Sequence, residues 1–114
     1  MQIGIGVDLV YIPRLVEISK ANPAMLMKVF SSEELTKNFN SLAGKWAAKE
    51  AFIKAIGVGW KWPLNHLEIL NEPSGKPYIS FNSQVGNVFE GLDIAVSISH
   101  DNEYATSVVF VIFK

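Results

Sequence analysis

The amino-acid sequence predicts an α+β domain in which an antiparallel sheet packs against one long central helix. Residues 2–10 alternate strictly between apolar side chains and small or polar ones, which is typical of a strand. Residues 42–56 form the clearest helix, and Gly57 directly after them suits a left-handed C-terminal cap. Residues 92–100 alternate again and residues 104–113 are rich in Val, Ile and Phe, so two further paired strands are expected.

The other elements are shorter. Pro13 stands where the first turn of a helix tolerates proline, and an apolar side continues to about Lys20. The segment 31–35, Ser-Ser-Glu-Glu-Leu, has the pattern of a helix start. The turn-forming segment 73–77 separates apolar segments at 67–70 and 78–81, which favours a hairpin. No repeat or linker interrupts the chain, so we expect residues 1–114 to form a single domain.

The composition restricts the chemistry. A chain of 114 residues with 49% hydrophobic and 11% aromatic residues has material for one core and favours contacts between subunits. The absence of cysteine excludes disulfides and thiolate metal sites, and two histidines do not suffice for a His-rich cluster. Any metal ion must therefore be held mainly by carboxylates.

The charge is balanced overall but uneven along the chain. The net charge of -1 argues against a general nucleic-acid-binding protein. Residues 1–57 carry seven Lys or Arg against five Asp or Glu, whereas residues 58–114 carry three against six. The first half is thus the better place for an anionic ligand. No apolar run approaches the roughly 18 residues of a membrane span, and no basic region precedes an apolar one near the N-terminus, so we expect a cytoplasmic protein without a membrane partner.

Two carboxylates from different elements are the main candidates for a site. Glu50 and Lys54 lie four residues apart on one face of the central helix, where they form either a ligand-binding recess or an ordinary surface ion pair. Asp8 stands on a strand face otherwise made of Gly4 and Gly6, and its alternative role is a cap or a strand-end charge. A few carboxylate oxygens with lysines nearby suit magnesium together with a substrate pyrophosphate.

Other residues and motifs are less specific. His100 ends an otherwise apolar row on its strand and is either a ligand-binding residue or a hydrogen-bonded core residue. The segment Gly4-Ile5-Gly6 lacks the third glycine of a dinucleotide fingerprint, and no nucleotide phosphate loop or nucleophile elbow occurs.

Three motifs together resemble the holo-acyl-carrier-protein synthases, the short homotrimeric type of the 4′-phosphopantetheinyl transferase family. They are Gly-Ile-Gly-Val-Asp-Leu-Val at 4–10, Trp-Ala-Ala-Lys-Glu-Ala-Phe-Ile-Lys-Ala-Ile-Gly at 46–57 and Ser-Ile-Ser-His at 97–100, in the order of the family. The resemblance runs from residue 3 to about residue 112. It implies the 4′-phosphopantetheinyl transferase fold and the transfer of 4′-phosphopantetheine from coenzyme A to a serine of apo acyl carrier protein, with adenosine 3′,5′-bisphosphate as the second product, in fatty acid biosynthesis.

The resemblance also implies roles for three catalytic residues, Asp8, Glu50 and Lys54. Asp8 and Glu50 would bind Mg²⁺, which bridges the pyrophosphate of coenzyme A. Glu50, directly or through a water, would take the proton of the carrier serine. Lys54 would stabilise or protonate the departing adenosine bisphosphate and contact its phosphates.

Further residues would bind the substrates. Lys45, Lys49 and His100 are implied to hold phosphates of coenzyme A, and Arg14 to meet the acidic carrier protein. The short members are homotrimers with active sites between subunits, the Asp and Glu from one chain and the Ser-x-Ser-His strand from its neighbour. Lys45 departs from the usual arginine, so a point charge replaces a two-pronged phosphate contact.

Two other functions fit part of the sequence. A metal-dependent nuclease-like phosphodiesterase would also use Asp, Glu and Lys, but such enzymes usually place the Glu and Lys two apart on a strand. A non-catalytic trimeric coenzyme A-binding module would be expected to lack one site residue, and none is missing. Trp60 and Trp62 after the central helix either pack in the core or line the coenzyme A site.

Overall fold

The computed structural model describes all residues from 1 to 114 and has the predicted α+β architecture. Its helices are α1 (Ile12–Ala21), α2 (Pro23–Val29) and α3 (Phe39–Ile56), with single 3-10 turns η1 (Glu34–Thr36) and η2 (Leu64–His66). Its strands are β1 (Gln2–Tyr11), β2 (Leu67–Asn71), β3 (Pro77–Phe81), β4 (Asp93–Asp101) and β5 (Tyr104–Phe113). None of the helices has both the length and the apolar character needed to cross a membrane.

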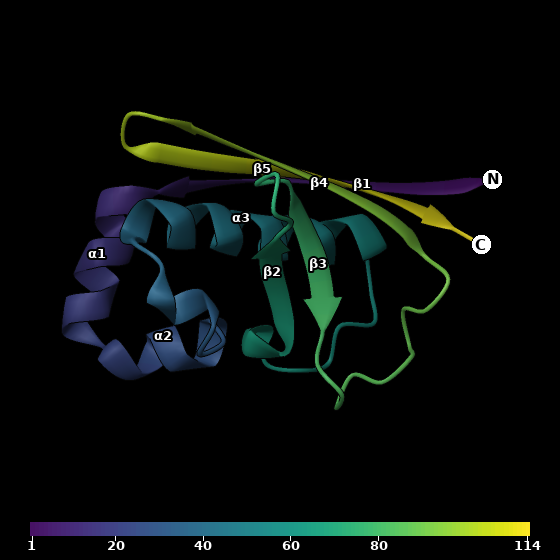
Figure 1. The fold of residues 1–114 in the computed structure, drawn as a ribbon, viewed down its shortest axis with the longest axis horizontal. Coiled ribbons are helices and arrows are strands. Elements are labelled where there is room, and N and C mark those ends of the chain that lie inside the picture. Colours follow the sequence, from purple (N-terminus) through teal and green to yellow (C-terminus); the bar gives the residue numbers. More distant parts are fainter.

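The strands form two antiparallel sheets around the central helix. The larger sheet has the order β1-β5-β4, so the last strand of the chain lies in its middle. Strands β2 and β3 form the predicted hairpin as a separate two-stranded sheet. Figure 1 shows α3 running along the underside of the larger sheet, with α1 and α2 gathered at one end. The long helix is therefore the element to which every other layer attaches.

Strand β1 packs directly on the backbone of α3 because two of its residues lack side chains. A Cβ atom on Gly4 would lie 2.0 Å from the Ala55 carbonyl oxygen, and one on Gly6 would lie 1.8 Å from that of Ala51. The space beside the two glycines on the Asp8 face of the strand is therefore occupied by the backbone of α3. Asp8 is consequently held within reach of α3.

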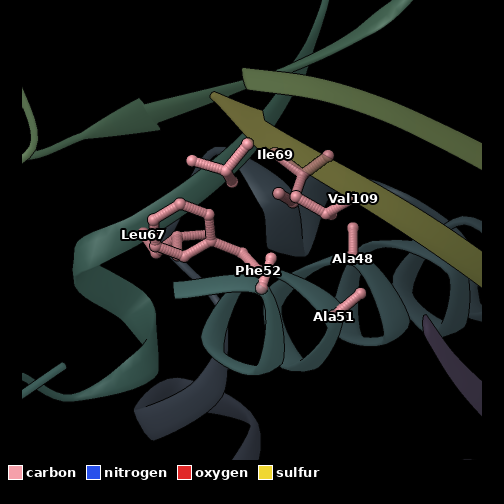
Figure 2. Close-up of a cluster of buried hydrophobic side chains, with 8 residues drawn as sticks. Ala48, Ala51, Phe52, Leu67, Ile69 and Val109 are labelled. Atoms are coloured by element: carbon pink, nitrogen blue, oxygen red, sulfur yellow. The ribbon is translucent and has the colours of Figure 1, made fainter. Parts of the chain in front are cut away.

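The main core lies between α3 and the two sheets. Phe52 projects from α3 toward the hairpin, where it meets the side chains of Leu67 and Ile69 (Figure 2). Trp60 stacks on Phe89 at a ring-centroid distance of 5.9 Å, and neither Trp60 nor Trp62 lines a hollow in this chain. These tryptophans thus extend the core. A second core between α1, α2 and the start of α3 is built on Leu15, Phe30 and Leu42.

The structure differs from the prediction most clearly at the start of α3 and at α2. Helix α3 begins at Phe39 rather than at residue 42, because the Asn38 side chain accepts a hydrogen bond from the Ser41 amide at 2.9 Å and caps the helix. Helix α2 was not predicted from the sequence; its seven residues are too few to show a clear period. The expected helix start at 31–35 forms a reciprocal cap, in which the Ser31 amide donates to Glu34 and the Glu34 amide to Ser31.

Candidate functional site

One hollow of about 240 Å³ lies where the end of β1 meets α1 and α3. Asp8 from β1 and Glu50 from α3 both line it, as does Arg14 from α1. The remaining walls are largely apolar and include Trp46. The structure therefore brings Glu50 of α3 to the same cavity as Asp8 and Arg14 from the start of the chain, so that two carboxylates and one guanidinium line it together.

Lys54 is paired with Asp8 and not with Glu50. Its ammonium donates to the Val7 carbonyl oxygen at 2.9 Å and to Asp8 Oδ1 at 3.2 Å. The ordinary ion pair along the helix between Glu50 and Lys54 is not formed, and Glu50 takes part in none of the three ion pairs of the chain. The Lys54 side chain is 56% exposed, so its ammonium can exchange partners without leaving a buried charge behind.

The donor set suits a cation that is shared with a substrate. No group of three or more His, Cys, Asp or Glu side chains that could hold a metal ion by itself occurs in the chain. Magnesium commonly binds through one or two protein carboxylates and completes its shell with water and substrate phosphates. Asp8 and Glu50 beside an open hollow meet this requirement.

A second hollow of about 200 Å³ contains the other predicted phosphate-binding residues. Lys45 from α3 and His100 from β4 line it together with the turn at Gly75. Lys45 is only 3% exposed, and its ammonium donates to the Ile69 carbonyl oxygen at 2.6 Å and to Asn71 Oδ1 at 3.0 Å. Burial lowers the pKa of Lys45, while the nearby Glu34 carboxylate opposes this shift.

His100 reaches the second hollow because the facing helix has a glycine. His100 Nε2 lies 2.8 Å from the Asn40 carbonyl oxygen, near the first turn of α3. A Cβ atom on Gly44 would lie 2.7 Å from Ile98 Cγ2 and 3.0 Å from His100 Nε2. The glycine thus allows β4 to lie close to the helix, with the imidazole at the edge of the cavity.

Lys49 is not placed at either hollow. Its ammonium is fully buried, and it donates to the Val29 carbonyl oxygen, to Glu34 Oε1 at 2.7 Å and to the Leu64 carbonyl oxygen. All three of its donors are used, so none remains for a phosphate in this arrangement. Burial lowers the pKa of Lys49, and the adjacent Glu34 carboxylate acts in the opposite direction.

Sequence reasoning missed the partners of these lysines. Glu34 is buried and also accepts a hydrogen bond from the Ile69 amide at 2.8 Å, so it joins the 29–34 segment, α3 and β2. The only signal for Glu34 was its place three residues after Ser31 in the capping pattern. Asn71 had no signal, because its role depends on a hairpin that folds back onto α3.

Arg14 stands on an aromatic platform. Its guanidinium carbon lies 5.8 Å from the centroid of the Tyr11 ring, and the Tyr11 hydroxyl donates to Glu103 Oε2 at 3.3 Å. The Glu103 carboxylate raises the pKa of Tyr11. Arg14 is thus an exposed residue that lines the first hollow and lies over the Tyr11 ring.

The outer side of the larger sheet carries exposed apolar side chains. We call this surface the apolar sheet face; it comprises Ile3, Ile5, Val7, Leu9, Val108 and Phe110. Cross-strand pairing places Ile5 opposite Phe110 and Val7 opposite Val108, so the patch is continuous across β1 and β5. Contiguous exposed apolar surface is typical of sites where a protein contacts another protein, a membrane or a ligand.

Comparison with known proteins gives a consistent result. The model of the family described as the 4′-phosphopantetheinyl transferase superfamily matches residues 4–109. The chain is 38% identical to the holo-[acyl-carrier-protein] synthase of Protochlamydia amoebophila, over 94% of this chain and 95% of that relative. It is 39% identical to the protein of the same name from Cytophaga hutchinsonii, over 97% and 96%.

Solved structures agree with the sequence relatives. An ACPS–CoA complex from Chronobacterium ammoniagenes superposes with a TM-score of 0.85 at 29% identity, covering 100% of this chain and 99% of that one. The Helicobacter pylori holo-[acyl-carrier-protein] synthase in complex with coenzyme A gives a TM-score of 0.80 at 29% identity, covering 95% and 99%. The similarity extends over nearly the whole length of both chains.

Proposed function

Because this chain belongs to the 4′-phosphopantetheinyl transferase superfamily, we infer that its first hollow is the active site of a holo-[acyl-carrier-protein] synthase. The reaction moves 4′-phosphopantetheine from coenzyme A to a serine of apo acyl carrier protein, which becomes the holo protein, and releases adenosine 3′,5′-bisphosphate. This activity supplies carrier protein for fatty acid synthesis. The observation that carries the assignment is the convergence of Asp8 and Glu50 on one hollow.

We assign Asp8 and Glu50 to hold Mg²⁺ when coenzyme A is present. Both are carboxylates, they come from separate elements, and the hollow between them has room for substrate oxygens. Bound there, the ion would neutralise charge on the phosphates as the phosphoryl bond breaks.

The chain's own residues supply the proton transfers. Glu50, which is free of ion pairs, takes the proton of the carrier serine directly or through a water molecule. The serine oxygen then forms a bond to the β-phosphorus, and the bond from that phosphorus to the oxygen of adenosine 3′,5′-bisphosphate breaks. Lys54 moves from Asp8 to the departing phosphate and stabilises or protonates it.

Lys45 and His100 are proposed to hold phosphates of coenzyme A at the second hollow. Lys45 has used two of its three donors within the chain, which leaves one for a ligand. Lys49 has none left, so we assign it to the support of α3 instead.

The two hollows are separate within one chain, which favours an assembly in which neighbouring subunits complete each other's site. We propose a homotrimer that buries the apolar sheet face. Ser97 and Ser99 lie on the exposed side of β4, so this strand is accessible to a neighbouring subunit. In that arrangement Asp8 and Glu50 of one subunit meet the His100 strand of the next.

Arg14 is proposed to receive the acidic carrier protein. It is exposed, it lies at the rim of the hollow that contains Glu50, and its positive charge attracts an acidic surface. A carrier docked there would present its serine to the hollow.

The direct test is mass spectrometry of an apo acyl carrier protein after incubation with this protein, coenzyme A and magnesium. We expect the carrier to gain one phosphopantetheine, and we expect the gain to disappear when a chelator removes the metal. A folded protein that binds coenzyme A but modifies no carrier would contradict the assignment and favour a non-catalytic binding module.

A further inference from the structure

The buried ammonium of Lys45 needs a fixed direction if it is to act on a ligand. A lysine carries its charge on four flexible carbons, and its three donors can rotate. In this chain the side chain is 97% buried, yet it lines the second hollow. The Ile69 carbonyl oxygen holds it from the side of β2 at 2.6 Å.

Asn71 supplies the second contact and, through its other end, links Lys45 to the hairpin turn. Asn71 Oδ1 accepts from Lys45 at 3.0 Å, while its Nδ2 donates to the Gly75 carbonyl oxygen at 3.0 Å. Because the amide nitrogen is engaged by Gly75, the oxygen must face Lys45. The side chain is thus oriented at both ends.

Gly75 itself is a wall of the same hollow. It has φ of 95°, a conformation that glycine adopts readily, and its amide donates to the Glu72 carbonyl oxygen at 2.8 Å. The turn is therefore closed internally, and Asn71 fixes its position relative to α3. Asn71 also lines the second hollow, and so does His100 on β4.

We propose that Asn71 is a positioning residue for the binding of coenzyme A phosphates, acting through Lys45 and the Gly75 turn. This inference rests on the proposed role of the second hollow. With Asn71 in place, the Lys45 ammonium has two fixed partners and one free donor beside the hollow, and the Gly75 wall is tied to the same asparagine. Without it, the ammonium keeps only the Ile69 contact and can rotate away from a ligand.

The test compares coenzyme A binding by calorimetry in four proteins: the unchanged chain, Asn71→Ala, Lys45→Met and the double variant. Because the Lys45 ammonium then loses one of its two fixed partners, we expect Asn71→Ala to weaken coenzyme A binding by about 10-fold. We expect Asn71→Ala to have little further effect in the Lys45→Met background, because its action passes through Lys45. At saturating coenzyme A, the turnover number of Asn71→Ala should stay within about twofold of that of the unchanged chain. The variant should therefore differ mainly in its KM for coenzyme A.

The matched control is Asn87→Ala, which removes an exposed asparagine that lines no hollow. It should leave binding unchanged. If Asn71→Ala binds like the unchanged chain, or if its effect is the same with and without Lys45, the positioning role is wrong. If Lys45→Met also binds normally, the proposed phosphate site itself fails, and this outcome is separate from the first.

Discussion

Two neighbouring residues of α3, Lys49 and Glu50, have opposite environments. The helix turns by 100° between them, which directs Lys49 into the second core and Glu50 to the first hollow. The buried ammonium is neutralised by Glu34, whereas the carboxylate of Glu50 has no ionic partner in the chain. At the scale of the residue, a buried supporting lysine and the proposed catalytic carboxylate therefore occupy adjacent positions.

The change Glu50→Gln should lower turnover by about 100-fold or more, because the amide can neither take a proton nor contribute a charge to the metal site. The thermal midpoint should stay close to that of the unchanged protein, since no ion pair is lost. Carrier modification followed by mass spectrometry and a circular-dichroism melt measure the two quantities. Glu90→Gln, an exposed glutamate outside both hollows, is the control, and equal activity of the two variants would contradict the role of Glu50.

The change Lys49→Met should destabilise the fold by about 3–5 kcal/mol, because it leaves the buried Glu34 carboxylate without its partner. The double change Lys49→Met with Glu34→Gln should recover part of that loss, because no buried charge remains. The recovery is incomplete, since the Ser31 and Ile69 amides donate to different oxygens of Glu34 and glutamine offers only one. Urea denaturation measures the free energy of unfolding of both variants. A double variant that is less stable than Lys49→Met alone would show that the ion pair is not the main contribution.

At the scale of the element, the contact between β1 and α3 determines where Asp8 lies. The strand can approach the helix only where Gly4 and Gly6 face it, and this close approach brings Asp8 to 3.2 Å from Lys54. The glycine face of β1 thus packs on α3, and its apolar face points away from the helix.

The change Gly6→Ala should lower the free energy of unfolding by about 3 kcal/mol or more, because the new methyl group meets the Ala51 backbone, which cannot rotate away. Gly86→Ala is the matched control: its φ is 66°, but a Cβ there meets nothing within 4 Å, so about 1–2 kcal/mol of backbone strain is expected. Urea denaturation measures the two free energies of unfolding. Equal losses for Gly6→Ala and Gly86→Ala would mean that β1 does not pack on α3 as closely as described.

The sequence predicted the strands and the long helix because their periods are local properties. It did not show which face of β1 is buried, since alternation is the same in either direction; the glycine face is inside and the Ile5 face is outside. The motifs singled out Asp8 and Glu50, which line one hollow, but they did not indicate that Lys54 pairs with Asp8 across 46 residues. The burial of Lys49 also depends on segments distant in the chain, which no local pattern records.

At the scale of the whole molecule, the apolar sheet face exposes a continuous apolar area to water in a single chain. Ile5, Val7 and Leu9 are each more than half exposed. Burying such a patch against other copies of the chain stabilises the assembly by roughly 25 cal/mol for each Å² of apolar area removed from water. The proposed trimer follows from this surface together with the two separate hollows.

The change Val7→Asp should convert the trimer to monomers and abolish most transfer activity, because a charge would be buried at the subunit contact. Size-exclusion chromatography with light scattering measures the assembly, and carrier modification measures the activity. Val58→Asp, at an 88% exposed position after α3, is the control and should remain trimeric. A monomer for the unchanged protein at micromolar concentration, or full activity of Val7→Asp as a monomer, would contradict the proposal.

The position of β5 in the middle of the larger sheet determines the order in which that sheet can form. Strands β1 and β4 both pair with β5 and make no pairing with each other. The β4–β5 pair is a hairpin of neighbouring segments, whereas the β1–β5 register joins Gln2 to Phe113 across almost the whole sequence. The hairpin can therefore form as a local unit, and the addition of β1, which requires the closure of a long loop, is the slower step.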